Sequence, residues 1–241
     1  MSTTDLRQPD EPDLFAFFQV IALGDTAGVA RMLHSSGNGI ALLAIRSGSS
    51  REDSRTYFLD AIRRHVYAGD TGVHIAAAAY QHSTVQLLLN RGASVRARNR
   101  RGAEPLHYAA DGIPDRLQSA ADAQREVIAY LVANGADPNT RDTSGVAPLH
   151  RAVRTRCSEA VQALLESGAD PNLPNKRGST PLHLAVQNTG RGGSGTATAR
   201  DQQARIIEML LGHGSRPTNI DANGRTVNVA ATSAWIRDLI P

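Results

Sequence analysis

Four regularly spaced histidines are the residues that most suggest chemistry. They lie at His74, His107, His150 and His183, with equal first and last intervals and a longer middle interval. Imidazole nitrogens bind zinc, but the ligands of a zinc site must converge on one ion at about 2 Å. The regular spacing indicates that each histidine belongs to a separate repeat. If the repeats stack at the usual distance between packed helices, successive histidines lie about 10 Å apart. We therefore expect no metal site and assign the histidines a structural role.

A glycine-rich segment has a spacing typical of phosphate-binding loops. Gly190, Gly192 and Gly195 form the pattern G-x-G-x-x-G before a predicted helix. In dinucleotide-binding proteins this loop follows a β-strand, and its backbone N–H groups hold the phosphates at the helix N-terminus. Here the preceding residues continue a predicted helix and no Walker lysine follows, so we interpret the segment as a flexible Gly/Ser insertion. An anion site formed by Arg191 and the glycine amides stays open as the alternative.

The single cysteine, Cys157, is the candidate nucleophile of the chain. A thiol nucleophile needs a base within hydrogen-bond reach. The nearby His150 belongs to the repeated set, for which we expect a structural role. Paired carboxylates, Ser/His/Asp sets and metal-ligand spacings do not stand out in the sequence. We therefore predict a non-enzymatic protein without a cofactor.

The histidines lie within a phrase that occurs four times, as TGVHIAAA, EPLHYAAD, APLHRAVR and TPLHLAVQ. Each copy precedes a segment with apolar residues at helical spacing, which ends in Gly-Ala or Gly-Ser. The distance from the histidine to this glycine is equal in the first and third copies and longer in the second and fourth. The base period is therefore about 33 residues, with insertions of about 10 residues in the second copy and about 13 residues in the fourth. Units of this size must stack to bury their apolar faces, which predicts a solenoid with a groove for partners.

From about Val66 to the C-terminus the chain resembles the ankyrin repeat family, in which the motif T-P-L-H-x-A recurs with a period of about 33 residues. The resemblance implies two antiparallel helices and a protruding β-turn finger in each repeat, and thus an all-α ankyrin-repeat solenoid. It also implies that the histidines connect the fingers of neighbouring repeats by hydrogen bonds. The amino-acid sequence of the repeats is similar to that of uncharacterised bacterial ankyrin-repeat proteins.

Each repeated phrase is expected to begin a helix. Thr180 can cap the N-terminus, and Pro181 suits the first helical position because its missing N–H would have no partner there. Glu104 and Ala147 replace the threonine in two copies, so these caps should be weaker by about 1 kcal/mol. The second helix of each repeat is expected to end at a glycine in the left-handed conformation, namely at Gly92, Gly135, Gly168 and Gly214.

The repeats lie between two capping segments. Residues 1–12 are expected to form a flexible N-terminus and residues 13–65 an irregular capping repeat, with two short helices within 13–35 and a helix-like segment at 58–66. The repeats occupy residues 66–98, 99–141, 142–174 and 175–220. Residues 221–241 form a C-terminal capping half-repeat. There Val229 takes the place of the histidine, and Trp235 is expected to seal the last apolar face.

A row of basic residues is the candidate binding site. In the ankyrin family, partners usually bind the finger tips and the exposed face of the first helix, and the offset from each histidine transfers these positions to this chain. They include Arg98, Arg100, Arg101, Asp111, Arg141, Arg154, Lys176 and Arg177. Arginine offers planar, paired donors that suit carboxylates and phosphates. We predict a protein–protein interaction module, an adaptor, regulator or inhibitor, whose basic concave groove binds an acidic protein segment.

Other interpretations stay open. The row is also compatible with a solvated, arginine-rich surface that has no specific partner. Nucleic acid is a less favoured partner, because the basic run at residues 96–101 is short and only Tyr108 lies near it for base stacking. A small-ligand-binding protein or an enzyme would have to use the insertions, at residues 111–126 and 188–201. A secreted bacterial effector is a further alternative.

The composition indicates a cytoplasmic protein. The net charge of the 241 residues is +3, and no apolar stretch is long enough to span a bilayer. The first residues lack the basic and then apolar pattern of a signal peptide. One cysteine excludes an internal disulfide and suits a reducing compartment. We expect a monomer in the bacterial cytoplasm that does not bind membranes.

Overall fold

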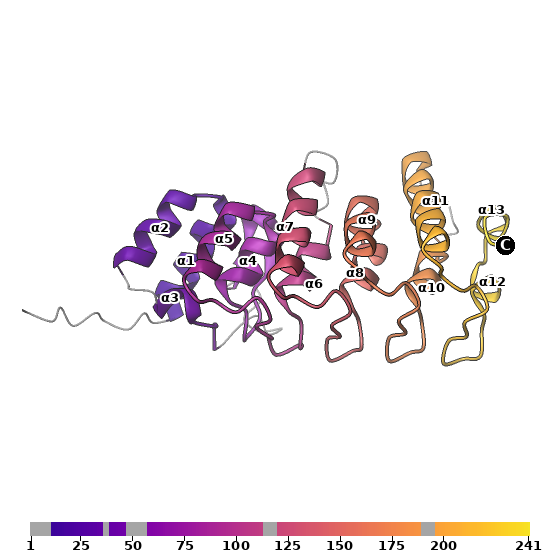
Figure 1. Ribbon diagram of the computed structural model, residues 1–241, viewed down its shortest axis with the longest axis horizontal. Helices are drawn as coiled ribbons and strands as arrows, with labels where there is room; N and C mark the ends of the chain where they lie inside the picture. Colours follow the sequence, from indigo (N-terminus) through magenta and orange to yellow (C-terminus); the bar gives the residue numbers. More distant parts are fainter. Residues whose placement is uncertain (1–10, 36–38, 47–56, 113–119, 189–195) are drawn as a thin grey trace, which may run out of the picture.

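The computed structural model describes residues 11–35, 39–46, 57–112, 120–188 and 196–241. Figure 1 shows a row of helix pairs that stack in chain order, with turns that project along one edge of the row. The described elements are helices except for one short pair of strands in the N-terminal segment. This architecture confirms the predicted all-α solenoid of helix-turn-helix repeats.

Four helix pairs form the repeats. The first helices of the pairs pack on one another, and so do the second helices. The first helices are α4 (Gly72–Ala78), α6 (Pro105–Ala110), α8 (Pro148–Arg154) and α10 (Pro181–Ala185), and the second helices are α5 (His82–Asn90), α7 (Ala121–Ala133), α9 (Ser158–Glu166) and α11 (Ala197–Gly212). Ala76, Ala77 and Ala78 are fully buried. Such small side chains let the first helices of adjacent repeats approach closely.

One continuous apolar core runs along the solenoid, from Leu14 to Ile240. The second helices contribute the residues that the helical spacing predicts, and Val85, Leu88 and Leu131 among them are fully buried. Burial of each such side chain stabilises the fold by about 1.5–3 kcal/mol. Because this surface is buried against neighbouring repeats, the stability of each repeat depends on the repeats beside it.

The turns that lead into the first helices, which we call the fingers, are joined by backbone hydrogen bonds. In each finger one N–H donates to a carbonyl of the preceding finger: Arg100 to Ala68 at 2.8 Å, Thr143 to Arg101 at 2.9 Å, Lys176 to Ser144 at 3.2 Å, and Ala222 to Arg177 at 2.9 Å. The glycines predicted to end the second helices have φ values of 85–97°, which confirms their left-handed conformation. Further glycines with positive φ lie within the fingers.

Gly178 shows how tightly the fingers pack. Its φ is +70°, and a Cβ atom at this position would lie 2.7 Å from the backbone nitrogen of Ala222 in the next finger. We expect Gly178→Ala to destabilise the protein by about 2–4 kcal/mol, from left-handed strain together with this overlap. Gly168→Ala is the matched control, because φ there is +88° but a Cβ would meet nothing within 4 Å. It should cost only about 1–2 kcal/mol. Equal losses in urea denaturation followed by circular dichroism would contradict the close finger packing.

The four repeat histidines connect successive fingers. Nδ1 of each ring accepts the backbone N–H of the residue three positions earlier, at 3.0–3.3 Å. The ring proton must therefore be on Nε2, which donates to a carbonyl of the following finger at 3.0–3.2 Å. These contacts confirm the hydrogen-bonding role implied by the family resemblance. Every first helix of the repeats thus has the same acceptor for the backbone N–H of the residue that precedes it. The hydroxyls of Thr71 and Thr180 contact the same nitrogen, at 3.0 and 2.9 Å, and Glu104 and Ala147 have no hydroxyl there.

Burial favours the neutral form of three of these imidazoles, those of His74, His107 and His150. Desolvation is the largest effect on His107 and His150, and it lowers the pKa of each to about 4. It also lowers the pKa of His74. A protonated ring would carry a hydrogen on Nδ1 that faces the N–H group now bonded to it. The bond from the backbone N–H to Nδ1 therefore requires the neutral ring, whereas Nε2 can donate to the following finger in either form.

The N-terminal segment differs partly from the prediction. Helices α1 (Glu11–Leu23) and α2 (Thr26–Ser35) confirm the two expected short helices, and α3 (Gly39–Leu42) follows. The prediction of a helix at residues 58–66 is wrong. Strands β1 (Phe58–Leu59) and β2 (Arg64–His65) pair there in antiparallel fashion around a short 3-10 turn, η1 (Asp60–Ile62). Arg63 has a φ of +48°, which ends the turn, and the rings of Phe58 and His65 pack edge to face across the strands.

The C-terminal cap consists of two short helices, α12 (Val227–Ala230) and α13 (Ala234–Arg237). Val229, which takes the place of the repeat histidine, is 65% exposed. Trp235 packs against the core but is only partly buried. Ile236 and Val227 are fully buried instead, so they share the sealing role that we expected of the tryptophan.

Candidate partner-binding groove

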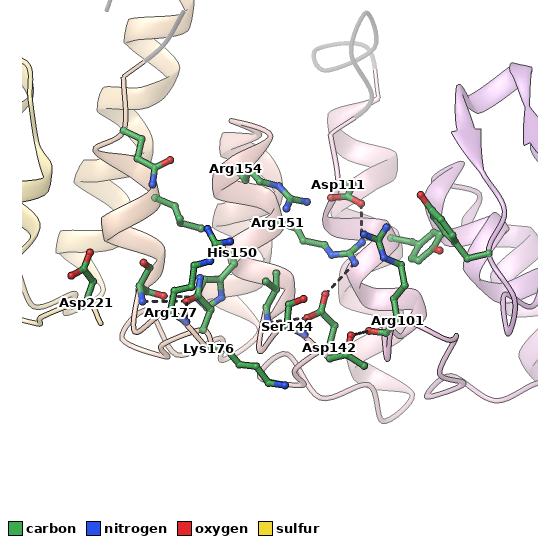
Figure 2. Close-up of a pocket in the computed structure, with 18 of the residues that line it drawn as sticks. Arg101, Asp111, Asp142, Ser144, His150, Arg151, Arg154, Lys176, Arg177 and Asp221 are labelled. Atoms are coloured by element: carbon green, nitrogen blue, oxygen red, sulfur yellow. Dashed lines mark hydrogen bonds and ion pairs between the residues drawn. The ribbon is translucent and has the colours of Figure 1, made fainter. Parts of the chain in front are cut away.

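A groove of about 930 Å³ lies between the fingers and the first helices, in the region drawn in Figure 2. Residues from the β1–β2 hairpin line it at one end, and residues from the last finger line it at the other end. Its cationic side chains are Arg63, Arg64, Arg101, Arg151, Arg154, Lys176, Arg177 and Arg225, and its carboxylates are Asp111, Asp142 and Asp221. The groove is therefore strongly basic, although the whole chain carries a net charge of only +3.

Asp111 is the centre of a buried ion-pair network at the floor of the groove. One oxygen of its carboxylate accepts hydrogen bonds from Arg64 at 2.9 Å and from Arg151 at 3.1 Å. Arg151 also lies 3.5 Å from the carboxylate of Asp142. The side chains of Asp111 and Arg151 are each 10% exposed. Burial alone would raise the pKa of Asp111, but Arg151 and Arg64 together outweigh this effect and hold the pKa below its usual value.

Tyr108 forms an aromatic platform for the two arginines. The guanidinium carbon of Arg64 lies 5.0 Å from its ring centroid, and that of Arg151 lies 5.8 Å away. The Tyr108 hydroxyl donates to Asp70 at 2.8 Å, and the side chain of Asn99 donates to the same carboxylate at 2.8 Å. This buried network fixes the ring, and stacking on the ring restricts the arginines.

The structure brings together five of the eight residues that the sequence predicts for the binding site. Arg101, Asp111, Arg154, Lys176 and Arg177 line the groove. Asp111 is held inside the protein by its two arginines, whereas the other four residues are exposed.

The other three predicted residues lie outside the groove lining. Arg98 donates to the backbone carbonyls of Gly102 and Arg141, and Arg141 is exposed but does not line the groove. The guanidinium group of Arg100 stacks 5.5 Å from the ring centroid of Tyr67.

The eight predicted residues leave out four arginines of the groove, namely Arg63, Arg64, Arg151 and Arg225. Arg151 follows the repeat histidine directly and precedes Arg154 by three residues, so helical spacing places both on neighbouring turns of one face. This signal was available in the phrase PLHRAVR. Arg63 and Arg64 had no such signal, because the hairpin that carries them has no equivalent in the repeats.

Two family models match the chain. Residues 117–221 match the model described as ankyrin repeats (3 copies), and residues 68–100 match the model described as ankyrin repeat. Together these matches cover more than half of the chain. The protein belongs to the ankyrin repeat family. None of the curated proteins matches the chain.

Ankyrin repeats are generally protein–protein interaction modules and are typically non-enzymatic. In this ankyrin protein the thiol of Cys157 is buried and donates to Gln124 at 3.0 Å, and burial raises its pKa to about 11. The thiolate, which is the reactive form, is therefore scarce at neutral pH. Among the described residues, no three His, Cys, Asp or Glu side chains are grouped to hold a metal ion.

The two insertions of the ankyrin repeats lie partly beyond the described residues. The G-x-G-x-x-G glycines and Arg191 fall within residues 189–195, and part of the first insertion falls within residues 113–119, both outside the description. In the described part of the chain, no helix has the length and apolar character needed to cross a membrane.

Proposed function

We propose that the groove of this ankyrin protein binds an acidic segment of a partner protein, and that the protein acts as a non-enzymatic adaptor, regulator or inhibitor. The observation that carries the proposal is the excess of arginine in the groove. All three carboxylates of the groove have arginine partners: Asp111 has Arg64 and Arg151, Asp142 has Arg151, and Asp221 has Arg225 at 2.8 Å. An acidic ligand would therefore meet cationic side chains and few uncompensated carboxylates.

The four predicted cations of the groove are exposed to such a ligand. Arg101 lies in the finger of the second repeat, Arg154 at the end of α8 in the third, and Lys176 and Arg177 in the finger of the fourth. Repeats stacked about 10 Å apart spread these charges over about 20 Å, which an extended peptide spans with about six residues. An acidic residue at about every third position would therefore meet each repeat in turn.

A charge-reversal variant tests the proposal. The probe is a pool of fluorescein-labelled peptides of about ten residues, with Glu fixed at every third position and neutral residues elsewhere. We expect the wild type to bind the pool with an affinity that falls as salt rises, because exposed charges are screened. The variant R101E/R154E/R177E should bind more than about tenfold more weakly, since each attraction becomes a repulsion. Fluorescence anisotropy at two salt concentrations measures both effects.

The matched control reverses three exposed arginines away from the groove, in R125E/R205E/R216E. It changes the net charge by the same amount, so it separates a specific groove from a general charge effect. Binding by the control should stay close to that of the wild type. If both variants lose affinity equally, or if the wild type does not bind the pool, the groove proposal is wrong.

We also propose that a single copy of the chain suffices and that it works in the cytoplasm. The single cysteine is buried and unpaired, which suits a reducing compartment.

A further inference from the structure

Four arginines line the part of the groove that borders the β1–β2 hairpin. Arg64 and Arg151 donate to the same oxygen of Asp111, so their guanidinium groups lie side by side. Arg154, at the end of α8, and Arg101, in its finger, line the same part of the groove, and the charge of Arg154 acts on Asp111 (Figure 2). We call Arg64, Arg101, Arg151 and Arg154 the arginine pocket.

The arginine pocket carries more positive charge than its own carboxylates balance. Among the described residues, Asp111 and Asp142 are the acidic partners of its arginines, and both bond to Arg151. Four guanidinium groups against two carboxylates leave an excess of two positive charges. A carboxylate ligand supplies one negative charge, whereas a phosphoryl group supplies about −1.5 to −2 at pH 7 and three strong acceptor oxygens.

The pocket is also organised before any ligand arrives. Arg64 and Arg151 are fixed by Asp111 and by the ring of Tyr108. Arg101 is held by the ring of Tyr67, whose centroid lies 4.9 Å from its guanidinium carbon. The side chain of Arg151 is nine-tenths buried, and its Nε has no hydrogen-bond partner among the described residues. Guanidinium groups held in this way lose little freedom when they bind a tetrahedral anion.

The aromatic residues of the pocket favour a peptide over a nucleic acid. Proteins that bind single-stranded nucleic acids offer open aromatic faces on which bases stack. Tyr108 is buried, and the ring of Tyr67 is flanked by the guanidinium groups of Arg100 and Arg101. Neither ring is therefore free for a base.

We propose that the arginine pocket binds the phosphoryl group of a phosphorylated side chain within the acidic segment of the partner. The inference rests on the proposed function, and it adds that the partner is recognised in its phosphorylated form. The hairpin closes this end of the groove, so the phosphorylated residue occupies one fixed position and the acidic residues extend from it toward Arg177.

Three matched peptide pools test the pocket. Each has about ten residues with Glu at every third position, and the central residue is serine, aspartate or phosphoserine. We expect the wild type to bind the phosphoserine pool at least about tenfold more tightly than the aspartate pool, because additional charge-assisted hydrogen bonds form. Fluorescence anisotropy gives the three affinities.

Two double variants locate the preference. R101Q/R154Q removes the two exposed arginines of the pocket and should reduce the preference for phosphoserine over aspartate to within about twofold. K176Q/R177Q removes the same amount of charge from the other part of the groove. It should weaken binding of all pools and keep the preference. All four positions are exposed, so both variants should fold, and circular dichroism checks that they do.

The outcomes distinguish failure of the pocket alone from failure of the whole groove. Equal binding of phosphoserine and aspartate by the wild type would overturn the pocket and leave the groove proposal standing. If K176Q/R177Q loses the preference as fully as R101Q/R154Q does, the phosphoryl group does not bind in the pocket. Tighter binding of a single-stranded oligonucleotide of matched charge than of the phosphoserine pool would also overturn the proposal. Failure of every pool to bind would overturn both proposals.

Discussion

Replacement of Asp111 by alanine is expected to lower the free energy of unfolding by about 3–5 kcal/mol. The carboxylate is the shared partner of Arg64 and Arg151, and the Arg151 side chain is only 10% exposed. Without Asp111, Arg151 would keep its charge in a buried site with Asp142 at 3.5 Å as its remaining acidic partner. Removal of one member of a buried pair costs more than the pair contributes, because the other charge stays desolvated. Urea denaturation followed by circular dichroism measures the loss.

A double variant distinguishes the unpaired charge from the loss of packing. In Asp111→Ala/Arg151→Met the buried guanidinium is replaced by an apolar side chain of comparable length. This protein should be more stable than Asp111→Ala alone, although it lacks one more polar group. For comparison, Arg31→Ala removes an exposed ion pair with Asp25 and should cost less than about 1 kcal/mol. A cost below about 1 kcal/mol for Asp111→Ala would show that the network does not hold the hairpin on the repeats.

Acidification is expected to destabilise the protein before its carboxylates are protonated. His107 and His150 have pKa values of about 4 in the folded state, whereas histidine in an unfolded chain has a pKa of about 6.5. Below pH 6.5 the unfolded chain therefore binds protons that the folded chain excludes. The stabilisation is complete above pH 6.5 and is lost as the pH falls toward 4. The lowered pKa of each of these two histidines contributes about 3 kcal/mol to the free energy of unfolding, and this contribution is lost over the window. The lowered pKa of His74 also makes the protein less stable as the pH falls.

Urea denaturation at several pH values between 7.5 and 4.5 measures this effect. The variant His150→Gln removes one titrating ring, so its stability should vary less steeply with pH than that of the wild type. His213→Gln is the control, because His213 is exposed and lies outside the finger contacts. Its pH dependence should match the wild type. Asp111 affects the pH dependence of stability only at lower pH. Its pKa in the folded state lies below 3.8, so its stabilising contribution is lost only as the pH falls further. A flat stability profile across this window would contradict the neutral histidine contacts.

The repeat sequence predicts most of the fold because each unit depends on few, local requirements. The regular period, the alanines of the first helices and Gly92, Gly135, Gly168 and Gly214 specify the helix pairs and their ends. The hairpin at Phe58–His65 was not predicted, because FLDAIRRHV has apolar residues at a spacing that also suits a helix. Its conformation depends on contacts with α1 and on Asp111, which is 47 residues away from Arg64. Such long-range contacts leave no periodic signal in a single sequence.

The candidate site was predicted only in part for a related reason. The offset from each histidine locates the finger residues, and it correctly places Arg101, Lys176 and Arg177 in the groove. The same rule includes Arg98 and Arg100, whose side chains turn toward Gly102 and Tyr67. The direction of a long, flexible side chain depends on its neighbours, and an offset does not contain that information.

The link from the hairpin through Asp111 to Arg151 has a mechanical consequence for the chain. It fastens residues of the N-terminal cap, the second repeat and the third repeat at one point, whereas the fourth repeat is joined to its neighbours through the ordinary finger and core contacts. A pulling force on the ends would therefore unravel the solenoid from its C-terminus, where short helices and the exposed Ile220 and Val229 form the last layer. The N-terminal half would yield later, at a higher force and in a single step.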